Sequence, residues 1–173
     1  MDNNDILIRL RYALDLKNTQ MQEIFKLGGV ELNDEQIRKI LIKSKDEDDL
    51  AMRDMEDNMP CDNHTLESFL NGFIIFKRGK QEPKEGKPEP PSHIMTDNKS
   101  VNNVLFKKLK IALALTSEDM LDILETAGVV ITKGELGAVL RKEGHKNYKA
   151  CGDRYARNFL KGLTIKNRKD IDL

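Results

Sequence analysis

The sequence contains NNDILIRLRYALDL at residues 3–16 and NNVLFKKLKIALAL at residues 102–115. The two stretches align at an offset of 99 residues, and this register continues without a gap for some 40 positions. The identical positions, numbered in the first copy, are Asn3, Asn4, Leu10, Ala13, Leu14, Leu16, Met21, Ile24, Gly29, Val30, Leu41 and Lys43. Self-similarity over this length indicates an internal duplication.

A second register, offset by 90 residues, aligns Cys61 with Cys151 and Gly72 with Gly162. The change of offset places extra residues in the first copy, within an acidic stretch. Four of the five prolines lie between the copies, where proline and charge together disfavour helix and strand. We expect an extended linker there, with His93 as a solvated residue. The predicted organisation is a first helical repeat, a linker and a second helical repeat at residues 1–80, 81–101 and 102–173.

Helix signals recur at matching places in both copies. The apolar residues at residues 3–16 and 102–115 follow helical spacing. Helix-capping residues and terminal glycines then divide each copy into four helices. The predicted signals are Asn3 or Asn4, Asn102 or Asn103, Thr19 to Gln22, Thr116 or Ser117, Gly29, Gly128, Asn33 to Gln36, Thr132 to Glu135, Asn63 and Asp153. The sequence therefore predicts an all-α fold of two tandem homologous four-helix copies, packed with pseudo-twofold symmetry.

Gly72 and Gly162 stand at the same place inside the fourth predicted helix of each copy. Glycine inside a helix costs up to about 1 kcal/mol relative to alanine. Its recurrence indicates close backbone approach, either at a tight helix crossing, for which a crossing between the copies is one arrangement, or beside a ligand. We favour the helix crossing, since close packing is the more common use of glycine.

The composition narrows the class of protein. Apolar residues make up 39% and charged residues 34%, and there is no Trp. No apolar run is long enough for a transmembrane helix, and MDNNDILIRL has no signal-peptide pattern. We therefore expect a cytoplasmic protein without membrane association, in which Cys61 and Cys151 are buried free thiols.

The charge is zero overall but unevenly distributed. Residues 1–98 hold 14 Lys and Arg against 20 Asp and Glu, whereas residues 99–173 hold 15 against 9. A basic helical stripe can follow phosphates, but it can equally be a solvated face or dock on the acidic half. The candidate contacts to nucleic acid or to a partner are Arg154, Arg157, Lys161, Arg168, Lys107, Lys108 and Lys110.

Known catalytic and metal-binding motifs are missing from the sequence, and we expect no cofactor and no metal site. The acidic stretch at residues 46–57 lacks the glycine and glutamate that a calcium loop requires. If the chain were an enzyme, the cluster to test would be His145, Tyr148, Cys151 and Asp153.

The sequence resembles the bacterial YehS-like proteins in three motifs taken together. These are the repeated NN pair, HKNYKACGD at residues 145–153 and FLKGL at residues 159–163. This family of unknown function carries its domain twice per chain, and the resemblance covers residues 3–80 and 102–169. The longer acidic segment around residues 46–57 departs from the family pattern. The resemblance implies an all-helical cytoplasmic protein and transfers no functional residues.

Two functions remain as expectations. The first is a non-enzymatic helical interaction or scaffold protein that binds a protein partner or self-associates through a groove between the copies. The alternative is a nucleic-acid-binding regulator that uses the basic face of the second repeat. We regard an enzyme as the weakest interpretation, because no acid–base or nucleophile set is recognisable.

Overall fold

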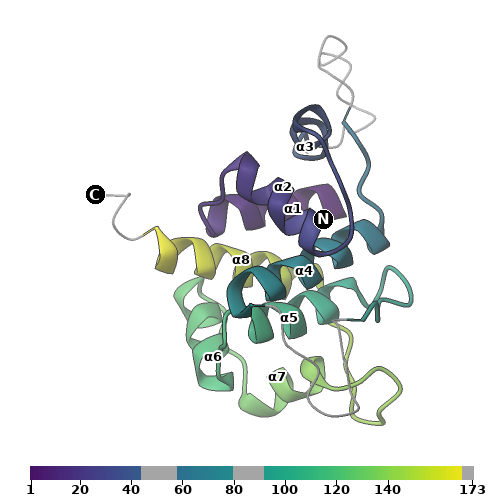
Figure 1. Cartoon of the computed structure of the whole chain (residues 1–173). Helices are drawn as coiled ribbons and strands as arrows, with labels where there is room; N and C mark the ends of the chain where they lie inside the picture. Colours follow the sequence, from purple (N-terminus) through teal and green to yellow (C-terminus); the bar gives the residue numbers. More distant parts are fainter. Residues whose placement is uncertain (44–57, 80–91, 169–173) are drawn as a thin grey trace, which may run out of the picture.

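A computed structural model describes residues 1–43, 58–79 and 92–168, and these residues form helices and connecting turns without a β-strand (Figure 1). None of the described helices is both long and apolar enough to span a lipid bilayer. The helices are α1 (Asn3–Ala13), α2 (Asn18–Leu27), α3 (Asp34–Ile40), α4 (Asn63–Arg78), α5 (Val101–Ala112), α6 (Ser117–Thr126), α7 (Lys133–Leu140) and α8 (Asp153–Asn167). The all-α prediction with four helices per copy is confirmed.

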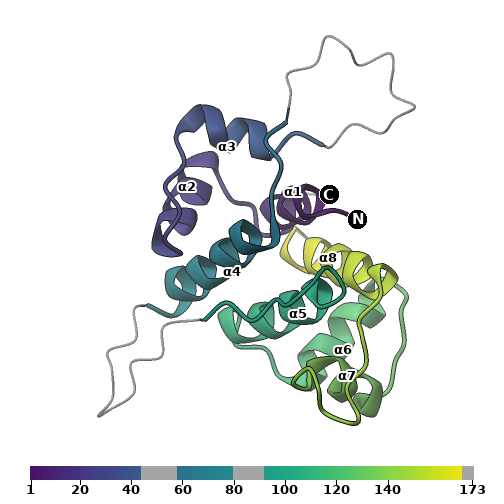
Figure 2. The same cartoon turned by 90° about the vertical axis from the view of Figure 1, so that its right-hand side faces the viewer.

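The first and last helices of each copy pack against the other copy. α1 contacts α8, and α4 contacts α5 (Figure 2). Exchanging the two copies converts the first of these pairs into the second, which is the relation expected of a pseudo-twofold axis. Outside this central layer, α2 and α3 lie on one side and α6 and α7 on the other. The predicted pseudo-twofold packing is therefore confirmed.

One hydrophobic core runs through both copies. Its largest side chains are phenylalanines, and each is almost completely shielded from water. In the first copy Phe25 of α2 lies 5.0 Å from Phe69 of α4, measured between ring centres. In the second copy Phe106 of α5 lies 4.8 Å from Phe159 of α8. Burial of such rings supplies the main stabilisation, and its continuity makes each copy part of the other's core.

Most of the predicted helix boundaries are confirmed. Asn33 caps α3, and Gln36 completes its capping box. Thr132 caps α7 and Thr116 caps α6 through their side chains. α2 ends at the predicted glycine signal, since Gly29 adopts a positive φ of 92° just beyond the helix. Its start is different: Gln20, rather than the predicted Thr19 to Gln22 box, accepts a hydrogen bond from the backbone N–H of Lys17.

The paired asparagines do not cap the first helix of either copy, which corrects that prediction. Asp2 caps α1 by accepting from the backbone N–H of Asp5 at 2.8 Å. Ser100 occupies the N-cap position of α5. The paired asparagines lie one to three residues beyond these caps, inside the helices, and their side chains reach across to other segments; they are Asn3, Asn4, Asn102 and Asn103.

Asn4 and its counterpart Asn103 act as buried clamps. Nδ2 of Asn4 donates to the carbonyl oxygens of Ile40 and Met59, each at 2.9 Å, and its Oδ1 accepts from the N–H of Cys61 at 3.1 Å. These bonds tie α1 to the end of α3 and to the segment that leads into α4. The corresponding bonds of Asn103 go to Val139 O, Lys149 O and Cys151 N.

Gly72 and Gly162 each lie at a close helix crossing, as predicted, but the crossing is within a copy and not between copies. A Cβ atom on Gly72 of α4 would lie 1.8 Å from the carbonyl oxygen of Ile24 in α2. A Cβ on Gly162 of α8 would lie 2.0 Å from the carbonyl oxygen of Ile123 in α6. Backbone atoms fill the space beside both glycines, so this space is not available to a ligand.

We predict that Gly162→Ala lowers the free energy of unfolding by about 1–3 kcal/mol. The new methyl group overlaps the backbone of Ile123 in α6, and relieving this overlap requires a shift of one of the two helices. Gly137→Ala in α7 is the matched control. No atom lies within 4 Å of a Cβ built there. This control gains up to about 1 kcal/mol from helix propensity. Urea denaturation measures both values, and a Gly162→Ala protein as stable as the wild type would contradict the close crossing.

Candidate functional site

Three of the basic residues predicted on the last helix are at the surface. Arg154, Arg157 and Lys161 of α8 are exposed. Arg168, just after α8, instead turns onto α1: its Nη1 donates to the carbonyl oxygen of Tyr12 at 2.8 Å, and its guanidinium carbon lies 4.1 Å from the centre of the Tyr12 ring. Arg168 therefore joins the two copies and does not extend the exposed stripe.

The basic patch predicted on α5 is largely covered. Lys108 is buried, with 5% of its surface exposed. Lys107 and Lys110 are half-buried. Burial lowers the pKa of Lys107, and the nearby carboxylate of Glu143 only partly offsets this effect. These three lysines therefore do not form one exposed surface with α8.

A groove of about 610 Å³ lies between α1 and α8, at one of the two contacts between the copies. Its lining includes Ile8, Arg9, Tyr12, Arg157, Leu160 and Lys161. We call it the α1/α8 groove. Ile8 and Leu160 give the lining an apolar part, and three cationic side chains accompany the exposed Tyr12. This groove can hold an elongated ligand that offers both apolar and anionic groups.

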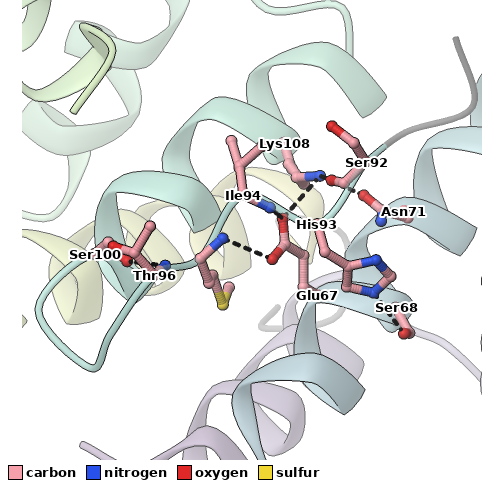
Figure 3. Close-up of polar contacts among 10 residues, drawn as sticks. Glu67, Ser68, Asn71, Ser92, His93, Ile94, Thr96, Ser100 and Lys108 are labelled. Carbon is pink, nitrogen blue, oxygen red and sulfur yellow. Dashed lines mark hydrogen bonds and ion pairs between the residues drawn. The ribbon is translucent and has the colours of Figure 1, made fainter. Parts of the chain in front are cut away.

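The pseudo-equivalent contact, between α4 and α5, is covered by residues 92–95 (Figure 3). We call this extended stretch the docked segment. The carboxylate of Glu67 in α4 accepts the backbone N–H groups of Ile94 at 2.7 Å and Met95 at 2.9 Å. Lys108 of α5 donates to the carbonyl oxygen of Ser92 at 2.7 Å. The end of the predicted linker is thus bound to the fold through its backbone.

Lys108 and Glu67 form an ion pair beneath the docked segment. Nζ of Lys108 lies 3.1 Å from Oε2 of Glu67, and both side chains are at least 94% buried. Lys108 also donates to Oδ1 of Asn71. Burial lowers the pKa of Lys108 even though the Glu67 carboxylate favours the charged form. Every hydrogen bond from this ammonium group therefore helps to keep a charge inside the protein.

His93 has specific partners, which the solvated role predicted for it does not include. Its Nε2 lies 3.0 Å from Oγ of Ser68 (Figure 3). Its ring stacks on His64 with 4.2 Å between ring centres. The ring is nevertheless exposed at the surface. His93 therefore helps to fasten the docked segment to α4.

The cluster of His145, Tyr148, Cys151 and Asp153 does not assemble around a reactive group. His145 is exposed in a turn, where its Nδ1 accepts from the N–H of Asn147. Burial raises the pKa of the Cys151 thiol to about 12, so the thiol stays protonated at neutral pH. Asp153 accepts from Asn102 and binds the N-terminal ammonium at 2.9 Å, and these interactions lower its pKa. The cluster connects segments of the fold.

Among the described residues, no three His, Cys, Asp or Glu side chains are arranged so as to hold a metal ion. His64 and Cys61, which the sequence places three residues apart, have different partners: His64 stacks on His93, and the amide of Cys61 binds Asn4. The acidic stretch at residues 46–57 lies outside the described residues.

Four residues of the two grooves are not among the predicted site residues: Glu67, Asn71, Arg9 and Tyr12. The signal was present in the repeat alignment, at positions where the copies differ. The offset of 90 residues pairs the acid Glu67 with the base Arg157. A charge reversal in a repeated helix marks a place where the two copies have different surroundings. Sequence comparison alone does not show which of the two positions is covered.

Comparison with known proteins identifies relatives without an assigned activity. The model of a family described as "Protein of unknown function (DUF1456)" matches residues 3–79 and 102–169, which are the two copies. The chain is 37% identical over 166 residues to the uncharacterized protein YehS of Escherichia coli strain K12, an alignment that covers 96% of each protein. No solved structure matches.

We predict that Lys108→Met lowers the free energy of unfolding by about 3–5 kcal/mol, because it leaves the Glu67 carboxylate buried without its cation. Arg9→Met is the matched control, since Arg9 stands at the same repeat position and is exposed. Its effect stays within about 0.5 kcal/mol. Adding Glu67→Gln to Lys108→Met recovers part of the loss. Equal effects of the two single substitutions in chemical denaturation would contradict this account.

We also predict that the two thiols make the protein less stable at alkaline pH. Burial raises the pKa of Cys61 and Cys151 from 9.0 to about 12. Above pH 9 the unfolded chain loses these protons and the folded chain keeps them, so stability falls as the pH rises toward 12.

The double variant Cys61→Ala, Cys151→Ala lacks this contribution. Between pH 7 and pH 10 the wild type loses more stability than the variant, by on the order of 1 kcal/mol per thiol. Urea denaturation at the two pH values measures the difference. The same pH dependence in both proteins would show that the thiols do not titrate as stated.

Proposed function

The chain belongs to the DUF1456 family, and from this premise we propose that it is a non-enzymatic helical interaction protein that binds a protein partner in the α1/α8 groove. Such a protein needs a rigid fold and an accessible surface, but no reactive group. The family is described as one of unknown function, and the relative YehS is uncharacterized.

The α1/α8 groove carries this proposal. Tyr12 is 53% exposed, although the large aromatic side chains of the core are almost completely buried. Arg9, Arg157 and Lys161 are exposed around it, and Leu160 contributes to the lining. Tyrosine and arginine are the residue types enriched where proteins bind one another, because each combines a large contact area with a polar group.

A rigid framework supports the groove from below. α8 is held by the close crossing of Gly162 on α6 and by the hydrogen bonds of Arg168 to α1. Asn167 adds a bond from its Nδ2 to the carbonyl oxygen of Ala13 at 3.1 Å. A partner therefore meets a surface that is already in place, which reduces the entropy lost on binding.

The alternative is a nucleic-acid-binding regulator, and the exposed Arg154, Arg157 and Lys161 favour it. These side chains follow one helix and are suited to contact phosphates. The exposed basic surface is shorter than predicted, because Lys108 is buried and Arg168 binds the carbonyl oxygen of Tyr12. The zero net charge of the chain also favours a protein partner over nucleic acid.

We predict that a photo-crosslinking amino acid, p-benzoylphenylalanine, captures a discrete protein in cells when it replaces Tyr12. The matched control is the same amino acid at Ile111, the repeat counterpart of Tyr12, which is 50% exposed. Because Ile111 lies beside the covered groove, it gives no such product. Adding Arg157→Glu to the Tyr12 variant removes the product if the groove holds the partner.

Identical products from both positions, or none from position 12, would contradict the interaction proposal. Fluorescence anisotropy with labelled DNA and RNA at 50 and 200 mM salt tests the alternative. Nucleic-acid binding that persists at the higher salt and is lost in Arg154→Glu, Arg157→Glu would replace the protein partner by a nucleic acid.

A further inference from the structure

The α1/α8 and α4/α5 grooves occupy equivalent positions between the copies, and the docked segment of the chain itself lies in the α4/α5 groove. The offset of 99 residues pairs Arg9 with Lys108, and the offset of 90 residues pairs Arg157 with Glu67 and Lys161 with Asn71. In the α4/α5 groove Lys108, Glu67 and Asn71 lie beneath the docked segment. In the α1/α8 groove their counterparts Arg9, Arg157 and Lys161 are exposed.

The docked segment is held mainly through its backbone. Glu67 accepts two consecutive N–H groups, from Ile94 and Met95, and Lys108 donates to the carbonyl oxygen of Ser92. Figure 3 shows these bonds on the side of the segment that faces α4 and α5. Recognition of this kind selects an extended peptide and leaves its sequence largely open, apart from side chains that meet the groove.

The α1/α8 groove occupies the equivalent position between the copies but is lined by an excess of positive charge. Arg157 replaces the carboxylate that accepts peptide N–H groups, and Lys161 replaces a neutral amide. Together with Arg9 these residues give three cationic donors, whereas the covered groove contains Lys108 and Glu67 in balance. A ligand must therefore bring negative charge, and carboxylates match arginine through paired hydrogen bonds.

The lining also requires an apolar group. Ile8, Tyr12 and Leu160 contribute apolar atoms to it. A nucleic-acid phosphate backbone carries no apolar side chain that could contact this part of the groove. An extended peptide does, because its side chains alternate and can place an apolar residue in the groove and acidic residues beside the cations.

We propose that the α1/α8 groove binds an extended acidic peptide of a protein partner, with an apolar side chain beside Tyr12 and carboxylates on the cationic side chains, at the position that residues 92–95 occupy on the α4/α5 groove. This inference rests on the proposed interaction function and specifies the chemistry of the partner. The docked segment shows that an extended stretch of chain lies across the equivalent groove, although the groups that hold it there differ.

Fluorescence anisotropy of the full-length protein with labelled peptides tests the proposal. The probe is DEIMDE, which flanks the Ile-Met pair of the docked segment with acids. The comparison peptides are KKIMKK, with reversed charge, and DEGGDE, without an apolar side chain. We expect DEIMDE to bind at least about tenfold more tightly than either comparison peptide.

Charge variants locate the site. Arg157→Glu, Lys161→Glu weakens binding of DEIMDE by at least about tenfold. Lys142→Glu, Lys146→Glu changes the net charge by the same amount at exposed positions outside the groove, and it leaves the affinity within about twofold. Equal weakening by the two pairs, or no preference for DEIMDE, would overturn the proposal.

A specificity exchange provides a second test. The variant Arg9→Lys, Arg157→Glu, Asn158→Ser, Lys161→Asn gives the α1/α8 groove the residues found at the equivalent positions of the covered groove. We expect it to lose DEIMDE and to gain binding of the peptide SHIMT, which is residues 92–96. A variant that folds, as judged by circular dichroism, and binds neither peptide would contradict the correspondence between the two grooves.

The two proposals fail in different ways. A crosslinked protein at Tyr12 with no binding of acidic peptides overturns this inference and leaves the interaction function standing. The absence of both overturns the two together. Binding of labelled DNA or RNA that competes with DEIMDE and requires Arg157 would replace the peptide by a nucleic acid.

Discussion

The first and last helices of each copy bury their apolar faces against the other copy, and the rest of the structure depends on this exchange. α1 lies on α8 and α4 lies on α5, so one core passes through both copies. A single copy would leave these faces in water, at a cost of about 25 cal/mol for each Å² exposed. The exchange also creates two equivalent grooves, one at each contact between the copies.

The positions that stayed the same in both copies make equivalent contacts. Asn4 and Asn103 clamp the segment before the last helix of their own copy. Gly72 and Gly162 allow equivalent close crossings. Arg78 donates to the carbonyl oxygen of Ile111 as Arg168 does to that of Tyr12. Each contact uses a backbone group as its partner, so the other side of the contact does not depend on side-chain identity.

The positions that diverged lie where the two copies have different surroundings. Glu67 and Lys108 became a buried pair beneath residues 92–95, because that stretch leads into α5 and lies across the α4/α5 groove. The chain has no corresponding stretch at the α1/α8 groove among the described residues. Arg9 and Arg157 therefore remain exposed there. Among the described residues, duplication thus produced one groove that the chain fills and one that is left accessible.

The sequence by itself determined the duplication, the number of helices and most of their ends, because these follow from periodicity and capping, which act over a few residues. It also indicated the close approach at Gly72 and Gly162. Only the tertiary structure decided which copy each helix packs on, since apolar faces of similar width do not specify a partner. For the same reason it alone decided the site: Lys108 and Arg9 look alike in the sequence, and their burial depends on a segment that reaches the groove from elsewhere in the chain.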